Sequence, residues 1–247
     1  MTKLFQHLIL TRFNVDLYGP KTKARLEPNA WMEHRLRLFE AFTLPSIAAQ
    51  SCQDFAWRIM MDSRTADAHV QTMERLCQTN MKLIFPVRGA NAWLSGVEPG
   101  AYDLLTTRID NDDAFHRDAV AALHETYRQN RKKLARPWVM VFPFGMIFDL
   151  GARRGWLMEY WYNNCPTLVE DGQAPQTIWQ WRHNQIPADV PRCPIKDIPY
   201  WLQVIHEQNL RNAIESPNAL RKIHKEVPMQ PKHLAPFGVD PERLPAA

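Results

Sequence analysis

Strand-type and helix-type segments alternate through the first 135 residues, and this alternation sets the class of fold. Short apolar runs typical of buried strands occupy residues 7–13, 55–61, 81–87 and 103–109. Apolar residues recur with helical spacing over residues 31–49, 66–78 and 114–134. We expect Pro45 to kink or restart the first helix. Strands joined through helices return in the same direction, so we predict an α/β fold with a mostly parallel central sheet and helices on both faces.

The second half of the chain has a different pattern. Aromatic and β-branched residues predict strands over residues 138–150 and 155–169, a short strand over 177–183 and a last helix over 198–216. Prolines and charges at the end predict an extended tail. We expect one domain over residues 1–247, with a first half (1–135), a second half (136–224) and a basic, Pro-rich tail (225–247).

Composition describes an ordinary globular chain. Apolar residues make up 45% of the 247 residues and charged residues 23%. A chain of this length and apolar content can bury a sizeable core. No apolar run reaches about 18 residues, and the first residues lack the pattern of a signal peptide, so we expect no transmembrane segment. The net charge of +4 permits anionic ligands such as nucleotides but does not require nucleic acid.

Cysteine spacing and missing motifs exclude several kinds of site. The four cysteines form no CxxC pair and are far apart: Cys52, Cys77, Cys165 and Cys193. This spacing argues against a zinc site or a disulfide framework and favours reduced thiols in the cytoplasm. The chain also lacks GxGxxG, GxxxxGK, GxSxG and HExxH, so dinucleotide, P-loop, hydrolase-elbow and zincin sites are not expected.

Three carboxylates fall within four positions where the fourth strand-type run ends. They are Asp110, Asp112 and Asp113, with Asn111 between the first two. Oxygen ligands from one loop suit Mg²⁺ or Mn²⁺, and water and a substrate phosphate then complete the coordination of the ion. Ligands of open α/β sheets bind beyond the carboxyl ends of strands, where this cluster is expected. The other interpretation is a solvated acidic turn that caps the next helix.

Three segments of the first half resemble the nucleotide-diphospho-sugar domain of inverting family 2 glycosyltransferases. Residues 8–14 (LILTRFN) are similar to the opening strand of that family, and residues 44–62 to its second helix and strand. Residues 109–113 (IDNDD) are similar to its LDxDD motif. The longer pattern LTRFN, LFE, TLPS and TRIDNDDA resembles the rhamnosyl transferases more closely. This resemblance implies the GT-A fold and a nucleotide-diphosphate sugar donor.

The resemblance carries roles over to matching positions. Asp110 and Asp112 match the DxD motif, in which Mg²⁺ or Mn²⁺ neutralises the leaving nucleoside diphosphate. Asp62 matches the carboxylate that contacts the nucleoside, although a plain turn residue is the alternative. Residues 61–64 (MDSR) replace the family's Asp-Asp-Gly-Ser, so only one carboxylate stands there.

Four further residues of the first half each have two open roles. Arg12 and Arg108 either contact phosphate oxygens of the donor or pair with the aspartates. Asn14 either lies near the base or supports its turn. Asp113 either contacts a sugar hydroxyl or caps the next helix.

The second half is expected to build the acceptor site. Inversion needs a carboxylate that takes the acceptor proton, and Glu170 with Asp171 matches the acidic pair of the family; the alternative is two acids in a surface loop. His183 either completes the metal site, touches phosphate, or is simply packed. Four tryptophans either form a sugar-stacking wall or fill the core: Trp156, Trp161, Trp179 and Trp181.

The resemblance therefore predicts a cytoplasmic, metal-dependent glycosyltransferase. It is expected to move a hexosyl or deoxyhexosyl group from a nucleotide-diphosphate donor to a saccharide or lipid-linked acceptor, with inversion. Peripheral contact with a membrane is compatible with this prediction. Two alternatives stay open: a metal-dependent nucleotidyltransferase, which also uses paired aspartates, and a non-catalytic binding module with an acidic structural turn.

Overall fold

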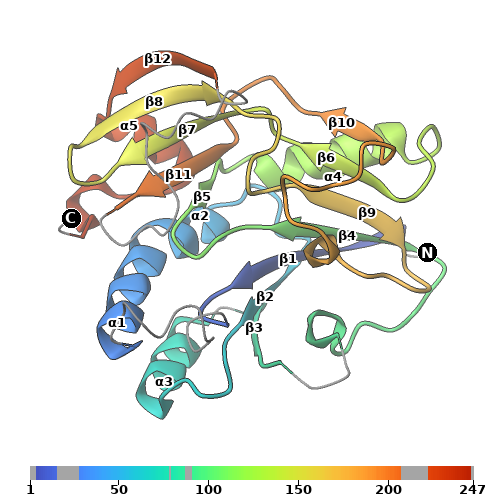
Figure 1. Cartoon of the computed structure of the whole chain (residues 1–247), viewed down its shortest axis with the longest axis horizontal. Helices are drawn as coiled ribbons and strands as arrows, with labels where there is room; N and C mark the ends of the chain where they lie inside the picture. Colours follow the sequence, from blue (N-terminus) through green and yellow to red (C-terminus); the bar gives the residue numbers. More distant parts are fainter. Residues whose placement is uncertain (1–3, 16–27, 78, 87–90, 207–221, 246–247) are drawn as a thin grey trace.

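Two sheets share the chain, and the larger one carries the parallel arrangement that the sequence predicted. The computed structural model describes residues 4–15, 28–77, 79–86, 91–206 and 222–245. Within these ranges the larger sheet has seven strands in the order β10-β6-β9-β4-β1-β2-β3 (Figure 1). The strands are β1 (Phe5–Arg12), β2 (Ala56–Met60), β3 (Met81–Ile84), β4 (Asp103–Arg108), β6 (Trp138–Val141), β9 (Thr167–Asp171) and β10 (Arg192–Pro194).

Strand direction in the larger sheet decides which residues meet at its edges. β1 pairs in parallel with both β2 and β4, and β2 pairs in parallel with β3. β9 runs antiparallel to both β4 and β6. The mostly parallel α/β prediction is therefore confirmed, and the carboxyl ends of β1, β2 and β4 lie at one edge.

The predicted helix over residues 31–49 is interrupted just before Pro45. It forms α1 (Pro28–Leu38), a π-helical turn η1 (Phe39–Thr43) and α2 (Leu44–Ala48). Pro45 stands in the first turn of α2, where its missing N–H has no intrahelical partner to lose. The expected restart at this proline is therefore confirmed. The other two predicted helices correspond to α3 (Asp67–Leu76) and α4 (Ala119–Asn130).

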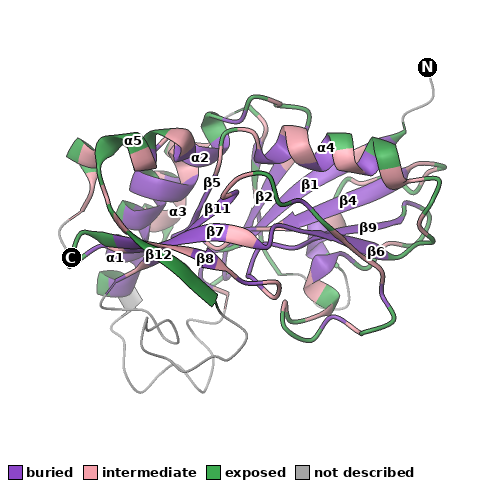
Figure 2. Cartoon of the chain, turned by 90° about the horizontal axis from the view of Figure 1, so that it is seen from above, coloured by how far each residue is buried: buried purple, intermediate pink, exposed green. Residues whose placement is uncertain are grey.

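The two faces of the larger sheet are covered differently. Phe5 and Ile9 of β1 join a core cluster that also holds apolar residues of α1, α3 and α4. Leu8 and Leu10, which alternate with them, join a second cluster with the 3₁₀ turns η2 (Ala92–Leu94) and η3 (Ile178–Gln180). In the described part of the chain, helices thus pack on one face of this sheet and short turns and loops on the other, so the predicted helices on both faces are not found (Figure 2).

The smaller sheet is built mainly from the second half of the chain. Its order is β12-β8-β7-β11-β5, and its strands are β5 (Ala114–Phe115), β7 (Phe144–Asp149), β8 (Arg154–Glu159), β11 (Trp201–Ile205) and β12 (Lys222–Pro228). The strands predicted over residues 138–150 and 155–169 are each divided between the two sheets. Pro143 causes the first division, because it cannot donate to a strand ladder.

Two elements predicted for the second half are wrong in type. Residues 201–205, inside the helix predicted over 198–216, form β11, whose aromatic and β-branched residues suit a buried strand. Residues 207–216 of that prediction lie outside the described residues. The short strand predicted over 177–183 is instead the 3₁₀ turn η3.

The predicted extended tail over residues 225–247 is correct only at its start, where residues 225–228 belong to β12. From residue 231 on, the C-terminal segment folds onto the core and forms α5 (Pro231–Leu234) and two 3₁₀ turns, Ala235–Phe237 and Pro241–Arg243. Leu234, Phe237 and Val239 are almost fully buried in one cluster with Phe42. Gly238 has φ +69°, and a Cβ there would lie 2.8 Å from the carbonyl oxygen of Pro45, so this close packing requires glycine.

Candidate functional site

Polar side chains gather where β1, β2 and β4 end. Asn14 follows β1, Asp62 follows β2, and residues 110–113 follow β4. Two hydrogen bonds tie these segments together. The backbone N–H of Asp62 donates to Asn14 Oδ1 at 2.9 Å, and Asn111 Nδ2 donates to the carbonyl of Phe13 at 2.9 Å. The first-half residues predicted for a site therefore meet at one edge.

Asp62 is a buried carboxylate held by its own turn. Arg64 donates to it from the backbone N–H at 2.9 Å, from Nε at 2.8 Å and from Nη2 at 2.7 Å. The hydrogen bonds from Arg64 lower the pKa of Asp62, so it is ionised at neutral pH. Asn14 also donates to Thr65 Oγ1 at 2.8 Å. Asn14 thus supports the turn, which is one of its two expected roles.

The three clustered aspartates have different environments. The side chain of Asp110 is 32% exposed and pairs with Arg108 Nη2 at 3.0 Å. Asp112 is buried and accepts from Arg35 Nη1 through Oδ2. Asp113 is buried and accepts from Asn164 Nδ2 and from the backbone N–H of Val204 at 3.1 Å. Only Asp110 therefore presents substantial carboxylate surface to solvent.

Opposite pKa shifts distinguish the two buried aspartates. Burial alone would raise the pKa of Asp112, but the charge of Arg35 and the hydrogen bond from His206 lower it to about 2. Burial and the neighbouring charges of Asp112 and Asp110 raise the pKa of Asp113. Asp112 is therefore the anion of this pair, and Asp113 joins β11 to Asn164 through the two hydrogen bonds that it accepts.

His206 is a site residue that the sequence analysis missed. It directly follows β11, is buried, and its Nε2 lies 3.0 Å from Asp112 Oδ2. Its Nδ1 lies 3.1 Å from Nε2 of His34 on α1. The signal was an apolar, β-branched run that ends in a polar residue, the same pattern that marks the ends of β1, β2 and β4.

The hydrogen-bonded atoms of Asp112 and His206 have the spacing of two adjacent ligands of a small divalent cation. Mg²⁺ holds its ligands at about 2.1 Å in octahedral geometry, so adjacent ligand atoms lie roughly 3.0 Å apart. Asp112 Oδ2 and His206 Nε2 have this separation. No three His, Cys, Asp or Glu side chains converge as metal ligands within the described ranges, so donor phosphates and water would supply the other positions. The bond from Arg35 to the same Oδ2 would have to shift on cation binding.

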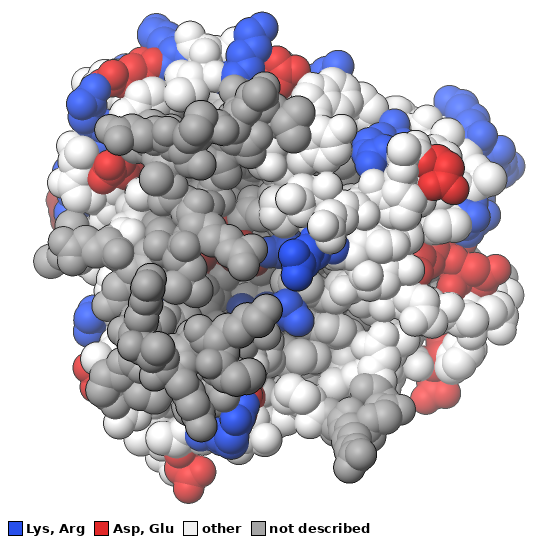
Figure 3. Space-filling model, viewed as in Figure 1, with Lys and Arg blue, Asp and Glu red and all other residues white. Residues whose placement is uncertain are grey.

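Arg12 and Arg108 meet over one tryptophan. Their guanidinium carbons lie 4.5 Å and 4.4 Å from the ring centroid of Trp179 in η3. Arg12 is exposed and Arg108 is half-buried. Lys and Arg atoms are visible near the middle of the face shown in Figure 3. This arrangement brings together two cations suited to bidentate phosphate contact.

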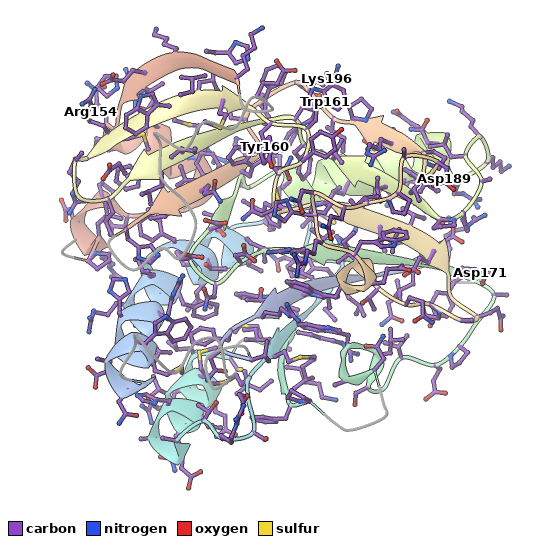
Figure 4. The ribbon with its side chains drawn as sticks, in the orientation of Figure 1. Arg154, Tyr160, Trp161, Asp171, Asp189 and Lys196 are labelled. Carbon is purple, nitrogen blue, oxygen red and sulfur yellow. The ribbon has the colours of Figure 1, made fainter. Side chains whose placement is uncertain are left out.

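Other tryptophans also carry cations over their rings. Lys196 Nζ lies 4.5 Å from the ring centroid of Trp161, and the two side chains lie together in Figure 4. The guanidinium carbon of Arg154 lies 5.6 Å from the ring of Trp156. These rings are half-buried, so they are neither pure core nor a free wall.

The structure places the predicted base, Glu170 and Asp171, away from the aspartates. Glu170 and Asp171 pair with Leu104 and Asp103, at the start of β4, because β9 runs antiparallel to it. Six residues of strand separate that position from Asp110, which is roughly 20 Å. Asp171 lies at the margin of the molecule (Figure 4). His183 Nδ1 lies 2.6 Å from the carbonyl oxygen of Tyr162.

Glu170 has a structural environment. It is buried, and burial raises the pKa of its carboxyl while three hydrogen bonds act against that shift. The donors are the backbone N–H groups of Gln176 and Thr177 and the side chain of Gln180. We therefore do not assign the acceptor base to Glu170 or Asp171.

The chain was compared with protein families, with curated sequences and with solved structures. A family model described as "putative rhamnosyl transferase" matches residues 6–217. No curated protein sequence matches the chain. Among solved structures, S. aureus TarS 1-349 in complex with UDP-GlcNAc is similar with 13% identity and a TM-score of 0.46, over 83% of this chain and 60% of that one. Another S. aureus TarS structure has 11% identity and a TM-score of 0.45, over 82% of this chain and 37% of that one.

The family match and the structural matches differ in how much of each protein they cover. The family model spans most of the described chain, whereas the chain covers less than two thirds of the TarS chains. No helix among the residues that the structure describes is both long and apolar enough to cross a bilayer.

Proposed function

The chain belongs to the family of putative rhamnosyl transferases, and from that premise we propose that it moves a sugar from a nucleotide-diphosphate donor to an acceptor hydroxyl. One observation supports the location of the reaction. The acidic segment after β4, the arginines over Trp179 and the Asp62 turn all lie at the carboxyl edge of parallel strands. This edge is where open α/β sheets bind nucleotides.

The proposed donor lies across the three strand ends. The nucleoside contacts the turn of Asp62 and Asn14, and the diphosphate lies toward Arg12 and Arg108, whose guanidinium groups offer paired donors to phosphate oxygens. Asp110 supplies the exposed carboxylate at the start of the acidic segment. The acceptor is a saccharide or a lipid-linked saccharide that approaches from the second half of the chain.

We also propose that the reaction depends on Mg²⁺ or Mn²⁺. Asp112 and His206 would hold the cation, and Asp110 belongs to the same acidic segment as Asp112. When bound, the cation would neutralise the charge that develops on the leaving nucleoside diphosphate. Nε2 of His34 would orient the His206 ring by its contact with Nδ1 of His206, as partners of metal-binding histidines commonly do.

A stability screen followed by product analysis tests this function. A panel of nucleotide sugars is added with Mn²⁺, and the melting temperature of the parent is compared with that of Asp62→Ala. A ligand that binds only the folded state raises stability, so one donor should shift the parent and not the variant. The selected donor should then yield free sugar and nucleoside diphosphate. Release of pyrophosphate, or a panel without any stabilising nucleotide sugar, would refute the proposal.

A further inference from the structure

Trp179 lies in a stack of aromatic and cationic groups. Its ring is nearly parallel to that of Trp93, with 5.8 Å between centroids and an angle of 6°. The guanidinium carbons of Arg12 and Arg108 lie 4.5 Å and 4.4 Å from its centroid. The two arginines come from the ends of neighbouring parallel strands, β1 and β4. One indole is therefore shared by two cations.

The indole reduces a repulsion that would otherwise separate these arginines. Two guanidinium groups that converge on one ring repel each other, and the carboxylate of Asp110 pairs with Arg108 at 3.0 Å. The negative face of an indole attracts a cation, and tryptophan provides the strongest such contact among the aromatic residues. Trp179 thus gives Arg12 and Arg108 a common position without neutralising either charge.

The turn that carries Trp179 has an unfavourable backbone conformation. Thr177 has φ +72°, a value that is rare for a β-branched residue. Such a residue persists only where surrounding contacts determine it. One contact comes from β4, where Thr106 Oγ1 accepts the N–H of Ile178 at 2.9 Å.

Glu170 of β9 supplies the other contacts. Its carboxylate accepts the N–H of Gln176 at 3.1 Å, the N–H of Thr177 at 2.8 Å and Nε2 of Gln180 at 3.1 Å. These donors flank Trp179 on both sides in the sequence. Because its carboxylate accepts three hydrogen bonds from this turn, Glu170 can hold the turn in place.

We propose that Trp179 is a positioning residue that holds Arg12 and Arg108 side by side for the phosphates of the donor, and that Glu170 fixes the turn that carries it. This inference rests on the proposed function. It gives Glu170 a role in donor binding through Trp179, at a distance from the acceptor proton.

Binding of three probes separates phosphate recognition from nucleoside recognition. Calorimetry measures the affinity of nucleoside, nucleoside diphosphate and inorganic pyrophosphate for the parent, Trp179→Leu and Trp179→Phe. Loss of two cation–π contacts should weaken diphosphate and pyrophosphate binding about tenfold. Nucleoside binding should not change, and Trp179→Phe should recover most of the loss. Trp181→Leu, in the same turn, is the matched control and should bind like the parent.

A spectroscopic measurement tests the part of Glu170. Glu170→Ala should weaken diphosphate binding and reduce the near-ultraviolet circular dichroism of the stacked Trp93 and Trp179 rings. Glu170→Gln keeps an acceptor oxygen and should retain more of both signals. If Trp179→Leu does not fold, the double variant of Arg12→Gln and Arg108→Gln should show the same selective loss of phosphate affinity.

The outcomes distinguish the inference from the proposed function. Equal weakening of nucleoside and diphosphate by Trp179→Leu, or unchanged diphosphate affinity, overturns the positioning role while the proposed function stands. Unchanged dichroism and affinity in Glu170→Ala overturn the role of Glu170. A parent that binds neither nucleoside diphosphate nor pyrophosphate overturns both.

Discussion

His206 Nε2 lies 3.0 Å from Asp112 Oδ2, so the end of β11 in the smaller sheet contacts the acidic segment that follows β4 in the larger one. His206 also lies 3.1 Å from His34 on α1. Three segments from distant parts of the sequence therefore converge on one carboxylate. Both halves of the chain contribute residues to this site, so substitutions in either half should change donor binding.

Removing either side of this contact should weaken cation binding. Asp112→Asn deletes an anionic oxygen, and His206→Ala deletes the ring nitrogen beside it. We expect the dissociation constant for Mn²⁺, measured by electron paramagnetic resonance with nucleoside diphosphate present, to rise by at least the 10–100-fold range typical of changes around metal sites. His224→Ala is the control, because His224 lies on the exposed strand β12 and pairs with Glu159. A His206→Ala variant with parental Mn²⁺ affinity would contradict this assignment.

Arg35 should matter for stability more than for donor binding. Its guanidinium donates to the buried carboxylate of Asp112, and both side chains are 9% exposed. Arg35→Met leaves that charge without its main partner, so unfolding free energy should fall by about 3–5 kcal/mol. Bound Mn²⁺ would replace the lost cation. The rise in melting temperature on adding Mn²⁺ should therefore be larger in Arg35→Met than in the parent; an equal or smaller rise would count against a cation at Asp112.

Strand direction explains why part of the site could be predicted from sequence and part could not. A polar residue after an apolar run lies at the carboxyl end of that strand. For β1, β2 and β4, which run in parallel, this places Asn14, Asp62 and Asp110 at one edge, as the sequence indicated. The same reasoning failed for Glu170, because β9 is antiparallel and its carboxyl end lies at the opposite edge. Local sequence gives the end of a strand but not its direction in the sheet.

His206 and the C-terminal segment were missed for a different reason. The pattern over residues 198–216 has helical spacing, yet burial between β7 and β5 makes residues 201–205 a strand. Tertiary contacts override local propensity in such cases. Likewise, the proline content of the C-terminal segment suggested an extended chain, while its few apolar residues decide where it packs.

Asp171→Asn should leave donor binding and sugar transfer close to parental values. Asp171 is exposed, and it pairs with Asp103 at the start of β4, away from the acidic segment. Surface substitutions of this kind usually change stability by less than about 0.5 kcal/mol. Steady-state transfer kinetics are the measurement, with Asp110→Asn as the impaired comparison. A loss of transfer on the order of 10²–10⁴ in Asp171→Asn would restore the acidic pair as the acceptor base.

Stability should fall as the pH is lowered below neutrality. His7 Nδ1 lies 3.0 Å from His124 Nε2 in the core, and burial lowers the pKa of both, to about 4 for His124. A histidine whose pKa is lower in the folded state stabilises the fold fully above its unfolded pKa of 6.5, and this stability is lost as the pH falls toward 4. For His124 the loss is about 3 kcal/mol. Urea unfolding between pH 7 and pH 4 should show this loss of unfolding free energy, and His124→Gln should make the free energy depend less on pH. If the variant loses as much stability as the parent over this range, the pH dependence does not come from His124.

The C-terminal segment should be a structural part of the fold. Phe237 is 2% exposed and packs in one cluster with Phe42, while Gly238 approaches the Pro45 carbonyl of α2. Phe237→Ala removes a large buried ring and leaves a cavity, so unfolding free energy should fall by about 3–5 kcal/mol. Leu244→Ala, at a half-buried position of the same segment, is the matched control and should lose much less. Chemical denaturation measures both. If Phe237→Ala unfolds at the parental denaturant concentration, the segment is an appendage whose packing contributes little to the stability of the fold.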